Sequence, residues 1–332
     1  MKKTKYLLRA ILNIDIAKMF RLVKLISKQS GKNIFYVIFD VIRCGIKYQA
    51  GYHDYLEFEF YNLNKEERKT YITRGINNQI VHKFNKREEW YKFNDKVIFQ
   101  QLFNKYTKRN FLYLDNNLIE FEEFFKKNKV IIVKPKDGEG GEGVEKLVYN
   151  SNVNISQLYN KLVSNNQLLI EECIVQHEKM NELYNGSVNT IRMFTFIKDG
   201  NTHFLGAVLK LGNGGIIDNF AGGGMYTILD DSGKIVYKAI DKDDNTFDVH
   251  PITKKNIIGF EVPMFKEAVD LVCNAAKVIP EVGYVGWDVA ISKDGPLIIE
   301  GNCYPGVFQT KPSLKKDKTG ALPKYNAVMN LY

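Results

Sequence analysis

Two runs near the end of the chain, Gly286-Trp287-Asp288-Val289-Ala290 and Ile298-Ile299-Glu300-Gly301-Asn302, indicate the fold most directly. Both are rich in β-forming residues, and the turn-forming residues between them are typical of a β-hairpin. A three-residue loop places Asp288 opposite Glu300, with Asn302 on the same face because side chains alternate along a strand. The opposite face is predicted to be core, formed by Trp287, Val289, Ile291, Leu297 and Ile299.

The polar face of this hairpin carries two carboxylates and one amide. Hard oxygen ligands of this kind suit Mg²⁺, which keeps water and phosphate in the rest of its shell. We therefore predict that Asp288, Glu300 and Asn302 bind magnesium beside a nucleotide. A surface hairpin with incidental polar residues is the alternative.

A glycine-rich loop follows an apolar strand at 130–134, which ends in Lys134, and precedes a second β-type run at 144–149. Its glycines match G-x-G-x-x-G, but a strand rather than a helix follows them, so a Rossmann site is not indicated. We interpret the loop as a hairpin lid whose backbone N–H groups approach a triphosphate; a flexible surface turn is the alternative. The predicted contacts are at Gly138, Gly140, Gly141 and Gly143.

A third segment combines a strand with an irregular connector. The strand continues through Glu171 and Glu172 to Cys173 and Ile174, and Glu178 follows shortly afterwards. Backbone N–H and C=O groups at such a connector suit the edge of a purine ring. A carboxylate just beyond it suits ribose hydroxyls.

The order of these motifs resembles that of the ATP-grasp superfamily, over about residues 50 to 310. The resemblance rests on Asn94-Asp95-Lys96, the Lys134 strand with its loop, the 171–174 connector with Glu178, and the 288/300/302 set. Further segments resemble the sugar-transfer-associated branch, which is linked to cell-surface polysaccharide synthesis. These are residues 187–192, Asp218-Asn219 with 222–224, His250-Pro251 and 286–288.

The resemblance implies an α+β, ATP-grasp fold in which two α/β subdomains clamp ATP. It implies that Lys96 and Lys134 bind the phosphates of ATP, and that Arg192 and Lys210 lie near the transferred phosphoryl group. It assigns adenine to residues 171–174, ribose to Glu178, and one or two magnesium ions to the hairpin set. Substrate contacts are expected at Asn189, Asp218, Asn219 and His250, although outward-facing or turn positions explain these residues as well.

The implied reaction is the ADP-forming ligation of a carboxylate to an amine, through an acyl phosphate, on a sugar or glycan precursor. Phosphoryl transfer needs positioning and charge neutralisation rather than a protein nucleophile. The sequence accordingly contains no G-x-S-x-G, H-E-x-x-H or C-x-x-C motif. A phosphotransferase acting on a sugar or polyol hydroxyl and a non-catalytic ATP-binding scaffold remain alternatives.

The expected organisation has three parts. Residues 1–90 form a mainly helical region, 91–186 a subdomain with the lid, and 187–332 a subdomain with the magnesium site and a C-terminal tail. We expect a helix over 95–107 capped by Asn94 or Asp95, and a helix over 263–277 packed on a mostly antiparallel sheet.

Composition indicates a globular enzyme. Of the 332 residues, 45% are hydrophobic and 26% are charged, which leaves ample apolar material for a core. The four cysteines are far apart and lack metal-binding spacing, which favours reduced thiols and a cytoplasmic location.

The net charge of +9 is concentrated at the N-terminus, where residues 1–50 contain eleven Lys or Arg residues and two Asp residues. Residues 4–28 have the pattern of a basic amphipathic helix. Such a helix either lies on anionic lipid at the inner face of the plasma membrane or packs on the enzyme. No signal peptide or membrane span is predicted, and the neutral remainder of the chain argues against nucleic acid.

Overall fold

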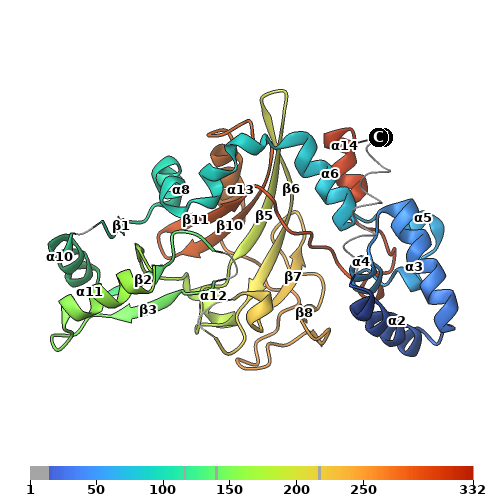
Figure 1. The fold of residues 1–332 in the computed structure, drawn as a ribbon, viewed down its shortest axis with the longest axis horizontal. Coiled ribbons are helices and arrows are strands. Elements are labelled where there is room, and N and C mark those ends of the chain that lie inside the picture. Colours follow the sequence, from blue (N-terminus) through green and yellow to red (C-terminus); the bar gives the residue numbers. More distant parts are fainter. Residues whose placement is uncertain (1–14, 116, 139–140, 216–217, 332) are drawn as a thin grey trace. The chain divides into compact units, whose positions relative to one another are not determined.

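The computed structural model describes residues 15–331, except for 116, 139–140 and 216–217 (Figure 1). The chain divides into two compact units. The first combines Met1–Lys83 with Gly306–Tyr332 and is called the helical unit below; the second, Phe84–Pro305, is called the two-sheet unit. The last part of the chain thus belongs with the N-terminal residues, whereas the division expected from sequence grouped it with the magnesium site.

Helices make up the regular structure described in the helical unit. They are α2 (Ile16–Ser30), α3 (Ile34–Tyr48), α4 (Tyr52–Glu57), α5 (Lys65–Arg68), α6 (Arg74–Phe84) and α14 (Leu322–Met329), with 3₁₀ turns at Phe60–Asn62 and Pro312–Leu314. Asp15 caps α2 by accepting a hydrogen bond from the Lys18 N–H, and Gly31 ends the helix in a left-handed conformation. The first part of the helix predicted over 4–28 lies outside the described residues.

A buried ion pair links α3 to α5 inside this unit. The guanidinium of Arg68 donates to both carboxylate oxygens of Asp40, at 2.9 and 2.6 Å, and the Tyr55 hydroxyl donates to the same carboxylate. Burial alone would raise the pKa of Asp40, but these partners keep it below its usual value. The ion pair fixes the orientation of α3, so one of its faces points into the core.

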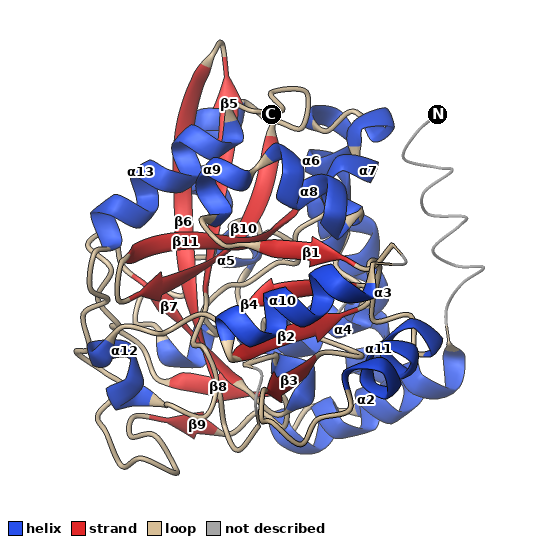
Figure 2. Ribbon diagram, turned by 90° about the vertical axis from the view of Figure 1, so that its left-hand side faces the viewer, coloured by secondary structure: helices blue, strands red, loops and turns tan. Residues whose placement is uncertain are grey.

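The smaller sheet of the two-sheet unit has four strands in the order β1-β4-β2-β3, and all of its pairs are antiparallel (Figure 2). Helix α10 packs on it through Phe121 and Phe125, and α11 contributes Leu162 to the same core. The bounds are β1 (Phe111–Tyr113), α10 (Leu118–Asn128), β2 (Val130–Lys134), β3 (Glu145–Val148), α11 (Ile155–Ser164) and β4 (Leu169–Glu172).

The larger sheet has seven strands in the order β11-β10-β5-β6-β7-β8-β9, again with antiparallel pairs. Helix α13 (Phe265–Ala276) packs on it, which confirms the expected helix and antiparallel sheet. The strands are β5 (Ile191–Lys198), β6 (Asn201–Leu211), β7 (Met225–Leu229), β8 (Ala239–Asp241), β9 (Thr246–Phe247), β10 (Tyr284–Ser292) and β11 (Gly295–Asn302).

Short helices connect these sheets. Asp95 caps α8 (Lys96–Leu102) by accepting from the N–H groups of Val97 and Ile98, as predicted. The single helix expected over 95–107 was wrong, because Phe103 interrupts it and α9 (Asn104–Thr107) follows. The remaining helices are α7 (Tyr91–Asn94) and α12 (Glu178–Leu183), with 3₁₀ turns at Arg87–Glu89 and Phe220–Gly222.

The β10–β11 hairpin reaches the predicted pairing by a different route. Ser292 pairs with Gly295, so the loop has two residues rather than the three expected. A β-bulge next to Asp288 then inserts one extra residue on β11. Asp288 therefore lies opposite Glu300, as predicted. The two-residue loop also changes the predicted core, because it pairs Ile298 with Val289. Ile298 joins the cluster that contains the fully buried Trp287, whereas Leu297 is buried outside that cluster and Ile299 is half-buried.

Within the part of the chain that is described, no helix is long and apolar enough to cross a bilayer.

Candidate functional site

Four adjacent strands of the larger sheet, β11, β10, β5 and β6, bring charged side chains to one face. Register places Asp288 of β10 opposite Glu300 of β11 on one side and opposite Arg192 of β5 on the other. Arg192 donates from Nε and Nη2 to the two carboxylate oxygens of Asp288, at 2.6 and 2.9 Å. Lys210 of β6 approaches the same carboxylate, with its Nζ 3.0 Å from Oδ2. Both predicted catalytic cations therefore contact a predicted magnesium ligand.

The two carboxylates of this cluster differ in electrostatics. Burial would raise the pKa of Asp288, but Arg192 and Lys210 hold it far below its usual range. Burial and the neighbouring negative charge of Asp288 raise the pKa of Glu300. Glu300 is therefore the member of the pair whose charge lacks full compensation, which a cation would supply.

Asn302 adds an unsatisfied polar group beside these acids. Its amide Nδ2 is buried and makes no hydrogen bond to the described residues. A buried polar group without a partner is unusual and points to a missing ligand or water. Since amide oxygen and nitrogen positions are assigned from their partners, the side chain can present either atom to a ligand.

A glycine permits the close packing beneath this cluster. A Cβ atom at Gly286 would lie 2.7 Å from Cβ of Pro305 and 3.2 Å from Cδ of Arg192. The glycine that precedes Trp287-Asp288 therefore leaves the space through which the Arg192 side chain reaches the carboxylate.

The smaller sheet contributes a second buried ion cluster. Lys134, at the end of β2, lies 2.8 Å from Oε1 of Glu171 on β4, and Arg109 lies 2.8 Å from Oε2. Gln100 of α8 donates a further hydrogen bond to Oε1. Burial would raise the pKa of Glu171, but Arg109 and Lys134 outweigh it and lower this pKa to about 2. The Glu171 side chain, predicted to lie at the adenine hinge, thus forms an ion pair with Lys134, the lysine predicted to bind phosphate.

The two clusters belong to one region of the two-sheet unit. Arg109 points its Nη2 towards the backbone carbonyls of Ile298 and Ile299 in β11, at 3.5 and 3.4 Å. The positive charge of Lys134 also lowers the pKa of Glu300, against the larger effects of burial and Asp288. Groups from both sheets therefore act on the same carboxylate.

The predicted lid is a β-hairpin, since β2 and β3 pair in antiparallel fashion on either side of the glycine-rich loop. Gly138, Gly141 and Gly143 adopt positive φ angles of 103°, 78° and 70°, which favour glycine. Gly140 lies outside the described residues. Lys96 donates from Nζ to the Gly138 carbonyl at 2.7 Å, so the first predicted phosphate lysine contacts the lid backbone. Burial and then Lys134 lower the pKa of Lys96.

The connector after β4 has no regular structure at Cys173 and Ile174, as expected for a segment with available backbone groups. The Glu172 carboxylate accepts from the backbone and side-chain amides of Asn110, at 3.3 and 3.1 Å. Glu178 is exposed in the first turn of α12.

Two of the predicted substrate residues have structural partners instead. Asn189 is fully buried; its amide group donates to Gln176, Met180 and Tyr184, and its oxygen accepts from the Gly212 N–H. His250 is also fully buried. Its Nε2 lies 2.9 Å from the Gly212 carbonyl, and its Nδ1 accepts from Ile252 and Thr253. The polar atoms of the Asn189 amide and the His250 ring are buried and already hydrogen-bonded within the protein. We therefore withdraw both residues from the candidate site.

Asp218 and Asn219 are different from this pair. The Asp218 carboxylate is buried and accepts from the N–H of Thr190 at 2.7 Å and from the Thr190 hydroxyl at 2.5 Å. Burial raises the pKa of Asp218 although Lys210 opposes it. Asn219 is half-buried, and its carbonyl accepts from Gly222 and Gly224, which forms the tight loop expected from the glycines.

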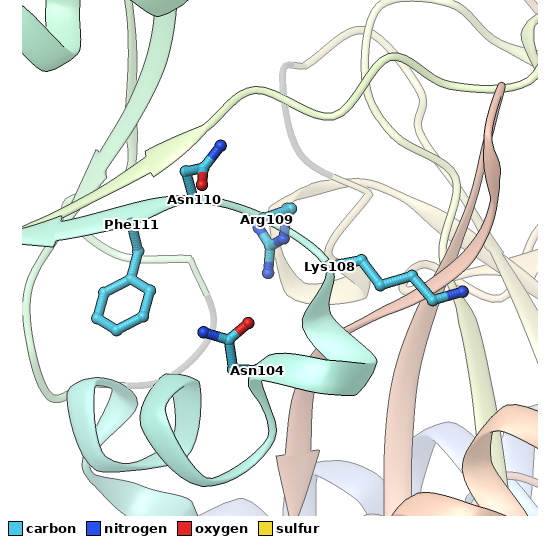
Figure 3. A pocket seen from close by; sticks show the side chains of 5 residues that line it. All are labelled: Asn104, Lys108, Arg109, Asn110 and Phe111. Carbon is cyan, nitrogen blue, oxygen red and sulfur yellow. The ribbon is translucent and has the colours of Figure 1, made fainter.

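Sequence reasoning missed Arg109 and Gln100, which complete the Glu171 cluster. Phe111 pairs with Glu171 in the sheet, so strand register brings Arg109 close to Glu171, but register is not visible in a single sequence. Arg109 also lines a pocket of about 220 Å³ with Asn104, Lys108, Asn110 and Phe111 (Figure 3). Lys108 points away from Arg109 in this view and donates to the Pro296 carbonyl at 3.0 Å.

The side chains of Asp288, Glu300 and Asn302 alone do not form a complete magnesium site. No three His, Cys, Asp or Glu side chains gather into a metal site among the residues described. The predicted set has two acids and one amide, and both Asp288 oxygens already accept from cations. Hard oxygens, the raised pKa of Glu300 and the unsatisfied Asn302 amide fit a metal that shares its shell with phosphate.

These features define the class of protein: an antiparallel two-sheet unit with a glycine-rich lid on one sheet and a cluster of acids and cations on the other. A family model described as sugar-transfer associated ATP-grasp matches residues 75–319. The chain belongs to this ATP-grasp family.

Solved structures similar to this chain include three ligases or synthetases. PsnB, an ATP-grasp ligase complexed with a minimal precursor, is 13% identical, with a TM-score of 0.41, over 67% of this chain and 56% of that chain. D-alanyl-alanine synthetase A from Vibrio cholerae O1 biovar eltor is 10% identical, with a TM-score of 0.39, over 65% of this chain and 56% of that chain. N5-carboxyaminoimidazole ribonucleotide synthetase from Thermotoga maritima is 13% identical, with a TM-score of 0.37, over 64% of this chain and 42% of that chain.

This chain therefore spans about half the length of these solved structures. None of the curated proteins matches it.

Proposed function

We propose that this protein is an ADP-forming ATP-grasp ligase that joins a carboxylate to an amine on a cell-surface glycan or its precursor. The observation that carries the proposal is the meeting of Asp288, Glu300, Arg192 and Lys210 on one sheet face, within the electrostatic reach of Lys134 from the other sheet. The glycan part of the proposal is supported only by the description of the family.

In this proposal Lys96 and Lys134 bind the phosphates of ATP beneath the lid. Lys96 already contacts the lid backbone, and Glu171 forms an ion pair with Lys134. The backbone of residues 172–174 would receive the adenine edge, and Glu178 would accept hydrogen bonds from ribose. These residues orient the triphosphate, which is the larger part of catalysis in phosphoryl transfer.

Asp288, Glu300 and Asn302 would hold magnesium, which neutralises developing charge on the phosphate oxygens. Asp288 can become a ligand only when Arg192 or Lys210 releases one of its oxygens. A triphosphate would offer these cations a new anionic partner, so metal and nucleotide are expected to bind together. Arg192 and Lys210 would then stabilise charge on the transferred phosphoryl group.

The acceptors are proposed by chemistry alone. A carboxylate that receives the phosphoryl group needs cations, which Arg192 and Lys210 provide, and exclusion of water, which a closed lid provides. Asn219, at the tight loop near Asp218, is the remaining candidate for substrate contact. ATP supply places the proposed reaction in the cytoplasm.

Thermal unfolding with a non-hydrolysable ATP analogue tests the nucleotide site first. Analogue at about 100 times its dissociation constant should add about 2.7 kcal/mol of stability, but only when magnesium is present. Lack of a shift in wild type would contradict the proposal. Asp294→Asn, at the exposed hairpin turn, is the matched control for the variants of Glu300 described below.

Phosphate release in the presence of paired carboxylate and amine candidates tests the reaction itself. Free phosphate with an amide product supports ligation. A stable phosphorylated product would replace the ligase with a phosphotransferase, and binding without turnover of any acceptor would favour the scaffold.

A further inference from the structure

An apolar stripe runs along the exposed side of α3 in the helical unit; α3 is drawn in blue in Figure 1. Phe35, Phe39, Ile42 and Ile46 have exposed fractions of 77%, 66%, 52% and 55%. They recur at spacings of four, three and four residues, so they share one face of the helix. Large apolar side chains gathered in this way on a surface mark an interaction site.

The stripe is not needed to build the core of its own unit. The opposite face of α3 is buried through Val37, Val41, Cys44 and Tyr48. The ion pair between Asp40 and Arg68 fixes that face inwards. The exposed side chains are therefore a second apolar face on a helix whose core face is already occupied.

Positive charge surrounds this stripe. Arg43 and Lys47 are exposed; Arg43 lies one helical turn after Phe39 and Lys47 one turn after Arg43, so the two cations form a row that flanks one side of the stripe. Lys24 and Lys28 are exposed on α2, which packs against α3. The one acid of α3, Asp40, is buried against Arg68 and does not offset these surface cations.

We propose that this face of α3 binds the surface of an anionic lipid bilayer. The helix would lie in the plane of the membrane, with its apolar stripe at the acyl boundary and its cations against the headgroups. The sequence placed lipid contact on residues 4–28, whereas the structure assigns it to α3. The inference does not depend on the proposed ligase activity.

Charge favours lipid over a second copy of this chain. A two-fold interface brings the same patch of both copies together. Both copies would then bring Arg43 and Lys47 into one interface, where α3 offers no exposed acid to pair with them, and like charges gathered at an interface are unfavourable. An anionic bilayer complements these cations instead.

Co-sedimentation of the full chain with vesicles tests the proposal. The two preparations are phosphatidylglycerol mixed with phosphatidylcholine, and phosphatidylcholine alone. We expect binding to the anionic vesicles, weakened by salt, and little binding to the neutral ones. Phe39→Ser should weaken binding about ten-fold or more, and Arg43→Gln about five-fold. Ile119→Ser, an exposed apolar position on α10 with an exposed fraction of 72%, is the matched control and should bind as wild type does.

Three outcomes would overturn the inference. One is equal binding by Phe39→Ser and wild type. Another is loss of binding only when residues 1–14 are deleted, which would assign lipid contact to that segment. The third is a concentration-dependent dimer in sedimentation velocity that Phe39→Ser abolishes while neither vesicle binds. An unchanged thermal unfolding midpoint without nucleotide would show that the Phe39→Ser variant remains folded.

Discussion

The two sheets of the two-sheet unit each surround one buried carboxylate with two cations, but the larger sheet also places a second carboxylate opposite the first. Glu171 accepts from Lys134, Arg109 and Gln100. Asp288 accepts from two cations as well, yet it faces a second carboxylate, Glu300.

Asn302 on the same strand as Glu300 has a buried amide nitrogen without a partner among the described residues. The difference teaches that a buried ion cluster is not by itself a site. Gln100 Oε1 and Arg109 Nε of the Glu171 cluster also lack a partner among the described residues, so the second acid is what separates the two. A closed cluster, in which cations compensate the acid, positions its neighbours, whereas a cluster with a second, uncompensated acid can bind a cation. The predictions below test this distinction.

The largest expected effect comes from removing the central acid of either cluster. Glu171→Gln and Asp288→Asn each leave two buried cations without their anion, which should lower the free energy of unfolding by about 3–5 kcal/mol. Urea denaturation measures this loss.

Two nearby carboxylates serve as controls for these variants. Glu172→Gln and Asp294→Asn remove less buried charges and should change stability by about 0.5 kcal/mol or less. A similar loss in Glu172→Gln and Glu171→Gln would contradict the closed-cluster interpretation.

The pH dependence of stability should separate the two clusters. Because the folded pKa of Glu171 is lowered from 4.5 to about 2, its contribution is present above pH 4.5 and is lost as pH falls towards 2. This loss amounts to about 3 kcal/mol. Glu300 has a raised folded pKa, so its contribution is present below the usual glutamate pKa and is lost as pH rises through the folded value.

Denaturation midpoints across pH measure both effects. Glu171→Gln should reduce the acid-side loss of stability, and Glu300→Gln should reduce the loss on the higher-pH side. If both variants flattened the same pH range, the electrostatic difference between the clusters would not hold.

Replacing Glu300 should affect the stabilisation by nucleotide more than it affects the stability of the free protein. Because Glu300 is the uncompensated acid, Glu300→Gln should fold at least as stably as wild type. It should nevertheless lose most of the magnesium-dependent shift of about 2.7 kcal/mol expected from the ATP analogue. Thermal unfolding with magnesium and with chelator measures both quantities, and magnesium without nucleotide should give a much smaller shift. Retention of the full shift in Glu300→Gln would remove this residue from the metal set.

The smallest expected effect concerns Asn302. Its amide nitrogen makes no hydrogen bond to the described residues, so Asn302→Ala should change the free energy of unfolding by about 1 kcal/mol or less. Asn189→Ala is the contrast, since four hydrogen bonds of a fully buried amide are lost. Urea denaturation of both variants measures the difference. Equal losses would show that Asn302 has a structural partner rather than a ligand-binding role.

The sequence by itself determined the features that depend on local pattern. The antiparallel hairpin with Asp288 opposite Glu300, the lid hairpin around the glycines and the Asp95 cap all follow from alternation, turn chemistry and capping. The order of these motifs also identified the family that residues 75–319 match. Each of these signals is contained in a few neighbouring residues.

Only the tertiary structure decided the features that depend on register and burial. The two-residue loop of β10–β11 selects Ile298 for the core, and the bulge brings Asp288 back opposite Glu300. The pairing of Arg109 with Glu171 and the burial of Asn189 and His250 join residues far apart in the chain. A single sequence specifies which side chains can form ion pairs and hydrogen bonds. Which of them meet is decided by strand pairing, because a shift of one residue turns a side chain to the other face of its sheet.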